Sequence, residues 1–112
     1  MFSATNGVNT HKGAIFSLGI LCAAAGRAES ADPETLLSLC GEIAQGITQK
    51  ELADAAPKTA GQRLFRQFGI SGARGQAEAG FPGARIGLSK LEVGLACGLS
   101  LNDAGCAALL AM

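Results

Sequence analysis

Helix start and stop signals recur along this sequence, and they limit the possible folds more than any other feature. Asp32, Pro33 and Glu34 supply a capping carboxylate, a proline suited to the first helical turn and an acidic group near the positive helix end. Gly69 is a typical helix stop, and Pro82 a typical start. No stretch alternates polar and apolar residues over the length of a useful strand. The sequence therefore predicts an all-α fold.

We expect a compact array of about five to six short helices, forming part of a larger helical domain. The expected helices run from His11 to about Ala28, from Pro33 to near Gly46, from Thr48 towards Pro57, from Thr59 to Gly69, from Pro82 towards Gly98, and from Ser100 onwards. The stretch Gly72-Ala73-Arg74-Gly75 between two of them is expected to be a loop, because glycines flank its arginine.

Caps and apolar faces follow from the same patterns. Asn9 or Thr10 is expected to cap the first helix, and the spacing of Thr48 and Glu51 predicts a capping box. In two later helices, apolar residues at intervals of three and four predict apolar faces. One helix carries Leu36, Leu39, Cys40 and Ile43 on one side, and the other is expected to direct Leu64, Phe65 and Phe68 inward.

The 112 residues suffice for one modest domain, which we expect to span residues 1–112. The last helix, with Leu101, Ala104, Ala108 and Leu109, is still apolar at Met112. We therefore expect the chain to be an internal fragment of a longer enzyme. The last helix would pack on missing segments of that enzyme or on a second copy in a homo-oligomer.

Charge, hydropathy and cysteine content argue against nucleic-acid binding, membrane association and disulfide bonds. Nine basic and nine acidic residues cancel, which argues against a nucleic-acid partner or an anionic membrane surface. The apolar run from Ala14 to Ala25 is too short to span a bilayer. The four cysteines lack paired spacing, so we interpret them as reduced thiols on helix faces of a cytoplasmic protein.

The segment from Thr5 to Gly13 places small polar residues, His11 and Lys12 at the mouth of a helix. Unpaired N–H groups and the helix dipole attract anions there, and a lysine ammonium suits phosphate. The segment is not a P-loop, which requires Gly where His11 stands and Ser or Thr where Gly13 stands. The alternative is a capped helix with a solvated lysine and a histidine bonded to a neighbouring carbonyl.

Three further charged residues are candidates for the same chemistry. Arg63 follows small residues that permit close approach of a ligand, whereas we expect Arg66 to be solvated. Arg74, between glycines, is a sensible anion clamp. Glu78 suits a metal ligand, an acid/base group or a salt-bridge partner of Arg74. The residues alone favour the salt bridge, because one carboxylate does not make a Mg²⁺ site.

Three strings in this order resemble the central motifs of the triphosphoribosyl-dephospho-CoA synthase family, which serves citrate lyase and malonate decarboxylase. They are Thr5-Asn6-Gly7-Val8-Asn9-Thr10-His11-Lys12-Gly13 with Ile15-Phe16-Ser17-Leu18-Gly19, then Thr59-Ala60-Gly61-Gln62-Arg63-Leu64, and Gly72-Ala73-Arg74-Gly75-Gln76-Ala77-Glu78-Ala79-Gly80-Phe81-Pro82. They cover about two thirds of the chain, and the tail from Gly83 resembles the family only in being helical and apolar.

The resemblance implies an enzyme whose substrates are small-molecule nucleotides. Family members join the triphosphoribosyl part of ATP to the 2′-hydroxyl of 3′-dephospho-CoA and release adenine. The product is the prosthetic-group precursor of the lyase acyl carrier protein. This displacement at an anomeric carbon needs a triphosphate clamp, help for the leaving adenine and a base.

Carried onto the matching positions, the chemistry assigns roles to eight residues. His11 and Glu78 are the candidate catalytic residues, and Glu78 is also the candidate ligand of a Mg²⁺ ion. The candidate contacts to the ATP phosphates are Asn9, Thr10, Lys12, Gly13, Arg63 and Arg74.

The family pattern also contains an upstream S-P-K-P-G-like stretch and a downstream G-D-T-N-like stretch, which this sequence lacks. Gln76 stands where the family often carries glutamate. We therefore expect this chain to be the middle part of the enzyme and to be inactive by itself. The alternative is a non-catalytic helical nucleotide-binding or assembly module derived from this family, and a transferase with another acceptor also fits.

Overall fold

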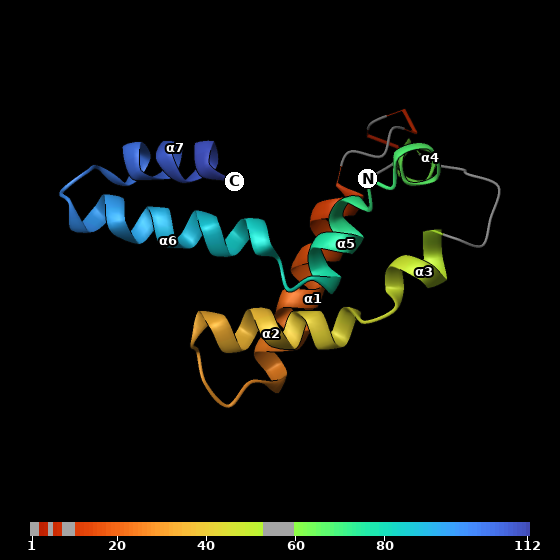
Figure 1. Ribbon diagram of the computed structural model, residues 1–112, viewed down its shortest axis with the longest axis horizontal. Coiled ribbons are helices and arrows are strands. Elements are labelled where there is room, and N and C mark those ends of the chain that lie inside the picture. The colour runs from red at the N-terminus through yellow and green to blue at the C-terminus, as the bar shows by residue number, and fades with distance from the viewer. Residues whose placement is uncertain (1–2, 5, 8–10, 53–59) are drawn as a thin grey trace. The chain divides into compact units, whose positions relative to one another are not determined.

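A computed structural model describes residues 3–4, 6–7, 11–52 and 60–112 of the chain (Figure 1). Within these ranges the chain is helical and has no strand, which confirms the all-α prediction. The helices are α1 (Lys12–Arg27), α2 (Pro33–Ala44), α3 (Ile47–Leu52), α4 (Ala60–Phe68), α5 (Gly72–Glu78), α6 (Pro82–Ala96) and α7 (Leu101–Ala111). All except α5 correspond to helices expected from the sequence.

The chain forms two compact units, Met1–Gly80 and Phe81–Met112. The first unit contains α1 to α5, and the second is the hairpin of α6 and α7. The prediction of one domain concerns the association of these units and stays a prediction.

In the first unit, α1, α2 and α5 pack against one another (Figure 1). Their shared core is made of small and medium side chains, each under a tenth exposed: Ala24, Leu37, Cys40, Ala44 and Ala77. Of the side predicted to be apolar in α2, Cys40 is buried and Leu36, Leu39 and Ile43 are half-buried, whereas the buried Leu37 was not part of the prediction. The buried stripe is rotated because α2 has α1 on one side and α5 on another.

Two features of α2 fix its place. The carboxylate of Asp32 accepts a hydrogen bond from the Thr35 N–H at 2.9 Å, which confirms the predicted cap. Further along, α2 passes so close to the end of α5 that a Cβ on Gly41 would lie 3.2 Å from the Glu78 carbonyl oxygen. A glycine at this crossing lets α5 lie against α2.

The predicted loop around Arg74 is wrong, because the structure forms α5 there. Ser71 already has helical dihedrals, and the Gly75 N–H donates to the Ser71 carbonyl at 3.4 Å. Arg74 and the residues after Gly75 favour helices, and burial of Ala77 against α1 and α2 adds tertiary support. Packing therefore outweighs the intrinsic cost of the two glycines.

The next two helices differ from expectation in their surroundings. Gly69 ends α4 with a φ of 71° and donates its N–H to the Phe65 carbonyl, as predicted. However, Leu64 is 44% and Phe68 63% exposed, so their predicted inward orientation is wrong. Among the described helices α4 packs mainly against α3, a helix of only six residues, which offers little surface to cover them. Thr59, the predicted cap, lies outside the described residues.

The second unit is an antiparallel hairpin with a seam of very small residues (Figure 1). Gly87 and Gly94 of α6 and Ala104 and Ala108 of α7 are its buried residues. A Cβ on Gly94 would lie 3.0 Å from the Ala104 Cβ, so glycine is what permits the close approach. The predicted Ser100 cap is confirmed, since its hydroxyl accepts from the Asp103 N–H at 3.1 Å.

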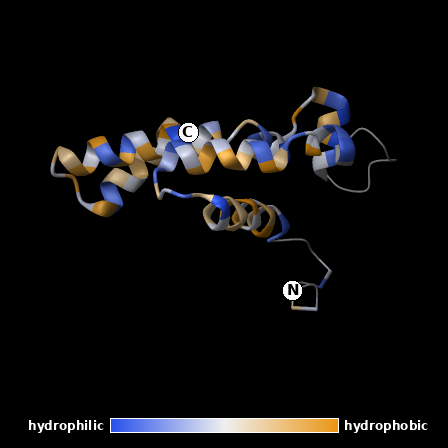
Figure 2. Cartoon of the chain, turned by 90° about the horizontal axis from the view of Figure 1, so that it is seen from below, coloured by the Kyte–Doolittle hydropathy of each residue, from blue (hydrophilic) through white to orange (hydrophobic). Residues whose placement is uncertain are grey.

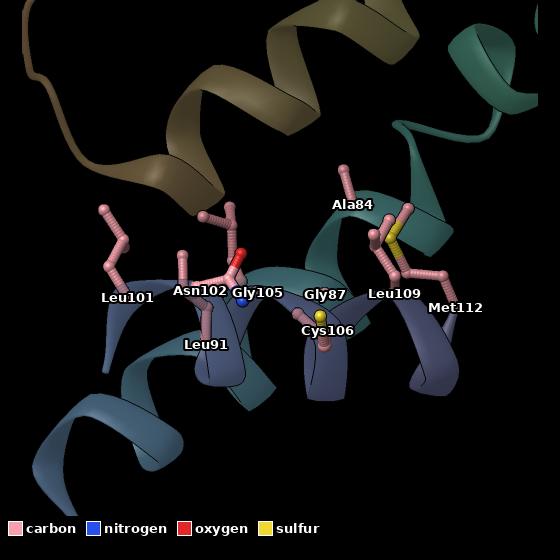
Figure 3. Close-up of a pocket in the computed structure, with 11 residues that line it drawn as sticks. Ala84, Gly87, Leu91, Leu101, Asn102, Gly105, Cys106, Leu109 and Met112 are labelled. Atoms are coloured by element: carbon pink, nitrogen blue, oxygen red, sulfur yellow. The ribbon is translucent and has the colours of Figure 1, made fainter. Parts of the chain in front are cut away.

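The large apolar side chains of this hairpin lie outside its seam. Hydrophobic residues recur along the helical segments that lead to the C-terminus (Figure 2). An open groove of about 800 Å³ follows the hairpin, and Leu101, Leu109 and Met112 project on the same side of it (Figure 3). Its lining contains no charged residue, and Asn102 is its one polar side chain. No described helix is both long and apolar enough to cross a membrane.

Candidate functional site

The candidate site begins at the amino end of α1. His11 is the residue that precedes the helix, with φ −124° and ψ −1°, and its carbonyl accepts from the Ile15 N–H at 2.9 Å. Its side chain does not cap the helix. Asn9 and Thr10, the predicted caps, lie outside the described part of the chain, as do their predicted phosphate contacts.

Lys12 and Gly13 occupy the first turn of α1, where backbone N–H groups have no partner within the helix. Both residues are exposed, and a Cβ on Gly13 would meet nothing within 4 Å. The first turn contains no acidic residue. A lysine and the positive helix end therefore occupy the same place, which is an electrostatic environment that favours an anion.

One row of side chains connects this exposed end to the core. Lys12, Phe16, Ile20 and Ala24 succeed one another at intervals of four residues, so they lie along one side of α1. Lys12 is exposed, Phe16 and Ile20 are half-buried, and Ala24 is fully buried. The rigid packed end of α1 therefore holds the exposed end in a fixed direction.

Arg74 reaches this row from α5. Its guanidinium carbon lies 5.8 Å from the centre of the Phe16 ring, which is within the range of a cation–π interaction. Because Phe16 follows Lys12 by one helical turn, the structure brings the charges of Arg74 and Lys12 to the same end of α1. This is the juxtaposition that the sequence motifs did not reveal.

Glu78, the other candidate of α5, contacts a different helix. Its two carboxylate oxygens accept hydrogen bonds from the Gly46 N–H at 2.8 Å and from the Thr48 N–H at 3.3 Å. These N–H groups belong to the start of α3. The predicted local capping box is therefore wrong: Thr48 lies inside α3, and the cap comes from a residue 30 positions further along.

The same contacts control the charge of Glu78. The nearby Thr48 hydroxyl and the N–H groups of Gly46 and Thr48 lower the pKa of the Glu78 carboxyl below its ordinary value. The Thr48 hydroxyl is shielded from solvent and makes no hydrogen bond of good geometry, so the two N–H groups are the contacts that stabilise the charged carboxylate. Glu78 is consequently a carboxylate at neutral pH and suits a base or a ligand better than an acid.

Arg63 and Arg66 both lie on α4 and are exposed. Among the packing contacts of α4, those with α3 predominate. The predicted role of Arg63 in the phosphate clamp stays a prediction.

The described residues contain no group of three or more histidine, cysteine, aspartate or glutamate side chains that could hold a metal ion. Glu78 stands alone and already accepts two N–H groups. Three oxygen ligands or more are usual around Mg²⁺, so these side chains do not form a magnesium site by themselves. All four cysteines are free, as expected, with Cys40 buried and the others exposed.

No solved structure matches the chain. The family model described as CitG, ATP:dephospho-CoA triphosphoribosyl transferase, matches residues 1–112. This match agrees with the resemblance seen in the motifs, and it extends over α6 and α7, for which the motifs gave no signal. The chain belongs to the ATP:dephospho-CoA triphosphoribosyl transferase family, which is a family of enzymes.

Proposed function

We propose that this chain binds the triphosphate of ATP between the amino end of α1 and Arg74, for transfer of the triphosphoribosyl group to dephospho-CoA. The family match supports the two substrates. The observation that supports the binding site is the position of Arg74 over Phe16, one turn from Lys12. A guanidinium fork, an ammonium and the N–H groups that lack a partner within the helix together suit a chain of phosphates.

In the proposed reaction, the bond from the ribose anomeric carbon to adenine breaks. The ribose 2′-hydroxyl oxygen of dephospho-CoA forms the new bond, and its proton balances the departure of adenine. Lys12 and Arg74 hold the triphosphate so that the anomeric carbon meets the incoming oxygen. His11, directly before α1, is proposed to contact a phosphate or transfer a proton.

Other residues complete the proposal. Asn9, Thr10 and Gly13 would offer polar or backbone groups beside Lys12, and Arg63 would bring a further cation from α4. Glu78 is charged and close to Arg74 in the sequence of α5, so a contact to ribose or to a Mg²⁺ ion bound by ATP stays open to it. The phosphates would then supply most of the oxygen ligands of that ion.

The clamp is tested by replacing its two cations separately. Lys12→Ala and Arg74→Ala should each weaken ATP binding about tenfold or more, because a charge-assisted hydrogen bond is lost. Isothermal titration calorimetry gives the affinities, and circular dichroism checks that the helices persist. Lys90→Ala, which removes a lysine from α6, is the control and should bind ATP like the unaltered chain. Unchanged affinity in both test variants would contradict the clamp.

The transfer itself is tested by release of adenine from ATP in the presence of dephospho-CoA. Release that requires both substrates supports the proposal, and mass spectrometry of the condensed product identifies the acceptor. Binding of ATP without any release would instead favour the nucleotide-binding module. We further propose that the product serves the acyl carrier protein of citrate lyase or malonate decarboxylase in the cytoplasm. Attachment of the converted product to either carrier protein would distinguish the two.

A second proposal concerns assembly, and the groove on the α6–α7 hairpin favours it. We propose that a second copy of the chain covers this groove. The groove is uncharged along its length, and Leu101, Leu109 and Met112 are each more than half exposed. Two hairpins that face each other across a two-fold axis would bury these side chains in a bundle of four helices.

Analytical ultracentrifugation tests the assembly. The unaltered chain should sediment as a dimer, and Leu109→Lys should sediment as a monomer because it would bury an unpaired charge. Val93→Lys is the matched control, since Val93 is exposed on the same hairpin but does not line the groove. A monomeric unaltered chain would contradict the proposal.

A further inference from the structure

The cation–π pair of α1 and α5 points to a residue that the proposed chemistry has not used. We propose that Phe16 is a positioning residue, which holds the Arg74 guanidinium in the direction required to grip the triphosphate of ATP. This inference rests on the proposed function of Arg74, and it explains what orients the Arg74 side chain. Phe16 itself is not proposed to touch the reacting atoms.

The first argument is conformational. An arginine side chain has several rotatable bonds, and fixing them costs rotamer entropy. A guanidinium held over a half-buried ring by a cation–π contact loses part of that freedom before ATP arrives. Binding then requires less ordering, which raises affinity without a new contact to the ligand.

The second argument concerns the kind of contact that Phe16 makes. A cation–π contact uses the charge of the guanidinium, and the ring accepts no conventional hydrogen bond from the N–H donors that lie in the plane of the group. Phe16 therefore supports Arg74 without competing for the donors that a phosphate needs. A carboxylate in the place of Phe16 would orient the arginine equally well but would occupy the fork.

The third argument is the rigidity of the support. Phe16 lies in the row that leads from Lys12 to the buried Ala24, and Arg74 lies three residues before the buried Ala77. Both partners are thus close to the packed contact of α1 with α5. Beside Arg74, Gly75 leaves the space that the Ser71 side chain fills.

A double-mutant cycle in ATP affinity tests the inference. Phe16→Leu keeps an apolar side chain but removes the aromatic face, and it should weaken ATP binding about two- to fivefold. In the Arg74→Ala background, Phe16→Leu should cause no further loss, because it acts only through Arg74. Phe16→Tyr, which keeps the aromatic face, should bind ATP with unaltered affinity. Phe68→Leu, the same change at an exposed phenylalanine on α4, is the matched control.

Fluorinated phenylalanines at position 16 keep the experiment decisive if Phe16→Leu perturbs the fold. Successive fluorines withdraw electrons from the ring face while its shape changes little, so ATP affinity should fall stepwise with their number. A merely structural ring would give the same affinity throughout the series. Inorganic tripolyphosphate should show the same trend, because the effect concerns the phosphates and not adenine.

The possible failures are distinguishable. If Arg74→Ala leaves ATP affinity unchanged, the proposed clamp and the role of Phe16 are both overturned. If Arg74→Ala weakens binding but Phe16→Leu and the fluorinated series do not, the positioning role alone is overturned. The same holds if Phe16→Leu weakens binding equally with and without Arg74.

Discussion

The two units of this chain use small residues for different purposes. In the first unit, Ala24 and Ala77 let three helices approach closely enough to bury Leu37 and Cys40. In the second, Gly94 and Ala104 bring two helices together, but the large apolar side chains stay outside the seam. Three helices can enclose a core, whereas two can only share a line of contact. The first unit therefore has a stable place for a binding site, and the second has a surface for association.

Truncation of a large side chain in each unit tests the difference in burial between the two units. Leu37→Ala should lower the free energy of unfolding by about 2–5 kcal/mol, because Leu37 is only 4% exposed and leaves a cavity. Leu110→Ala on α7 removes the same atoms from a side chain that is 91% exposed, and it should change that energy by less than about 0.5 kcal/mol. Urea denaturation measures both. Equal losses would mean that Leu110 is covered and that the contrast is wrong.

A smaller effect is expected from filling the seam of the hairpin. Gly94→Val should destabilise the α6–α7 contact by about 1–3 kcal/mol, because even the first added carbon would lie 3.0 Å from Ala104. Gly19→Ala is the control: no atom lies within 4 Å of the position, and alanine favours the helix by about 1 kcal/mol. Thermal melts should therefore shift in opposite directions. A stabilising Gly94→Val would show that the seam is loose.

The hydrogen bonds between Glu78 and the start of α3 should contribute less to the stability of the fold than these packing contacts, and their contribution should depend on pH. Glu78→Gln should increase amide hydrogen exchange in α3, because the carboxylate that caps this helix is lost. The folded pKa of Glu78 is lowered, so its stabilisation is present above the ordinary pKa and is lost as the pH falls through the folded value.

The unaltered chain should accordingly lose protection of α3 as the pH falls below about 4.5, the ordinary glutamate pKa, and Glu78→Gln should show little of this dependence. Asp32→Ala is the control, because it removes the side chain that caps α2, and Asp32 also has a lowered pKa. That variant should affect exchange in α2 and leave α3 protected. If the unaltered chain and Glu78→Gln show the same protection of α3 at every pH, Glu78 does not stabilise that helix.

Thiol reactivity distinguishes the buried Cys40 of the first unit from the exposed cysteines of the hairpin, and the measurement barely changes the stability of the fold. Burial raises the pKa of the Cys40 thiol, which should therefore react with a disulfide reagent only on unfolding. Cys97 and Cys106 of the hairpin are exposed and should react rapidly in the folded chain. Cys106 lines the groove, so high protein concentration should slow its reaction if two copies associate there. Cys97 does not line the groove and is the internal control.

Local signals in the sequence predicted the elements well where one residue decides a helix boundary. Asp32 and Ser100 cap the helices that they were expected to cap, and Gly69 ends α4. These outcomes depend on a hydrogen bond or a dihedral angle within a few residues, so the chain carries the whole cause locally. The predicted loop at Arg74 failed because burial of Ala77 in a tertiary contact outweighed two glycines.

In the candidate site, too, the sequence predicted the local features and missed the tertiary contacts. The motifs named His11, Lys12, Arg74 and Glu78 as chemical groups, and the family match supports the substrates that such groups would meet. The motifs did not show that Arg74 would lie over Phe16, or that Glu78 would cap α3. Both contacts join residues that are at least 30 positions apart, and no short-range pattern encodes such a pairing.

The sequence by itself determined that the chain is helical, where most helices begin and end, and which family it belongs to. Those properties follow from backbone chemistry over a few residues and from motifs that are read in order. Only the tertiary structure decided which side of each helix is buried, which helix Glu78 serves, and which ring supports Arg74. These depend on how α1, α2 and α5 approach one another, because packing selects among faces that the sequence leaves nearly equivalent.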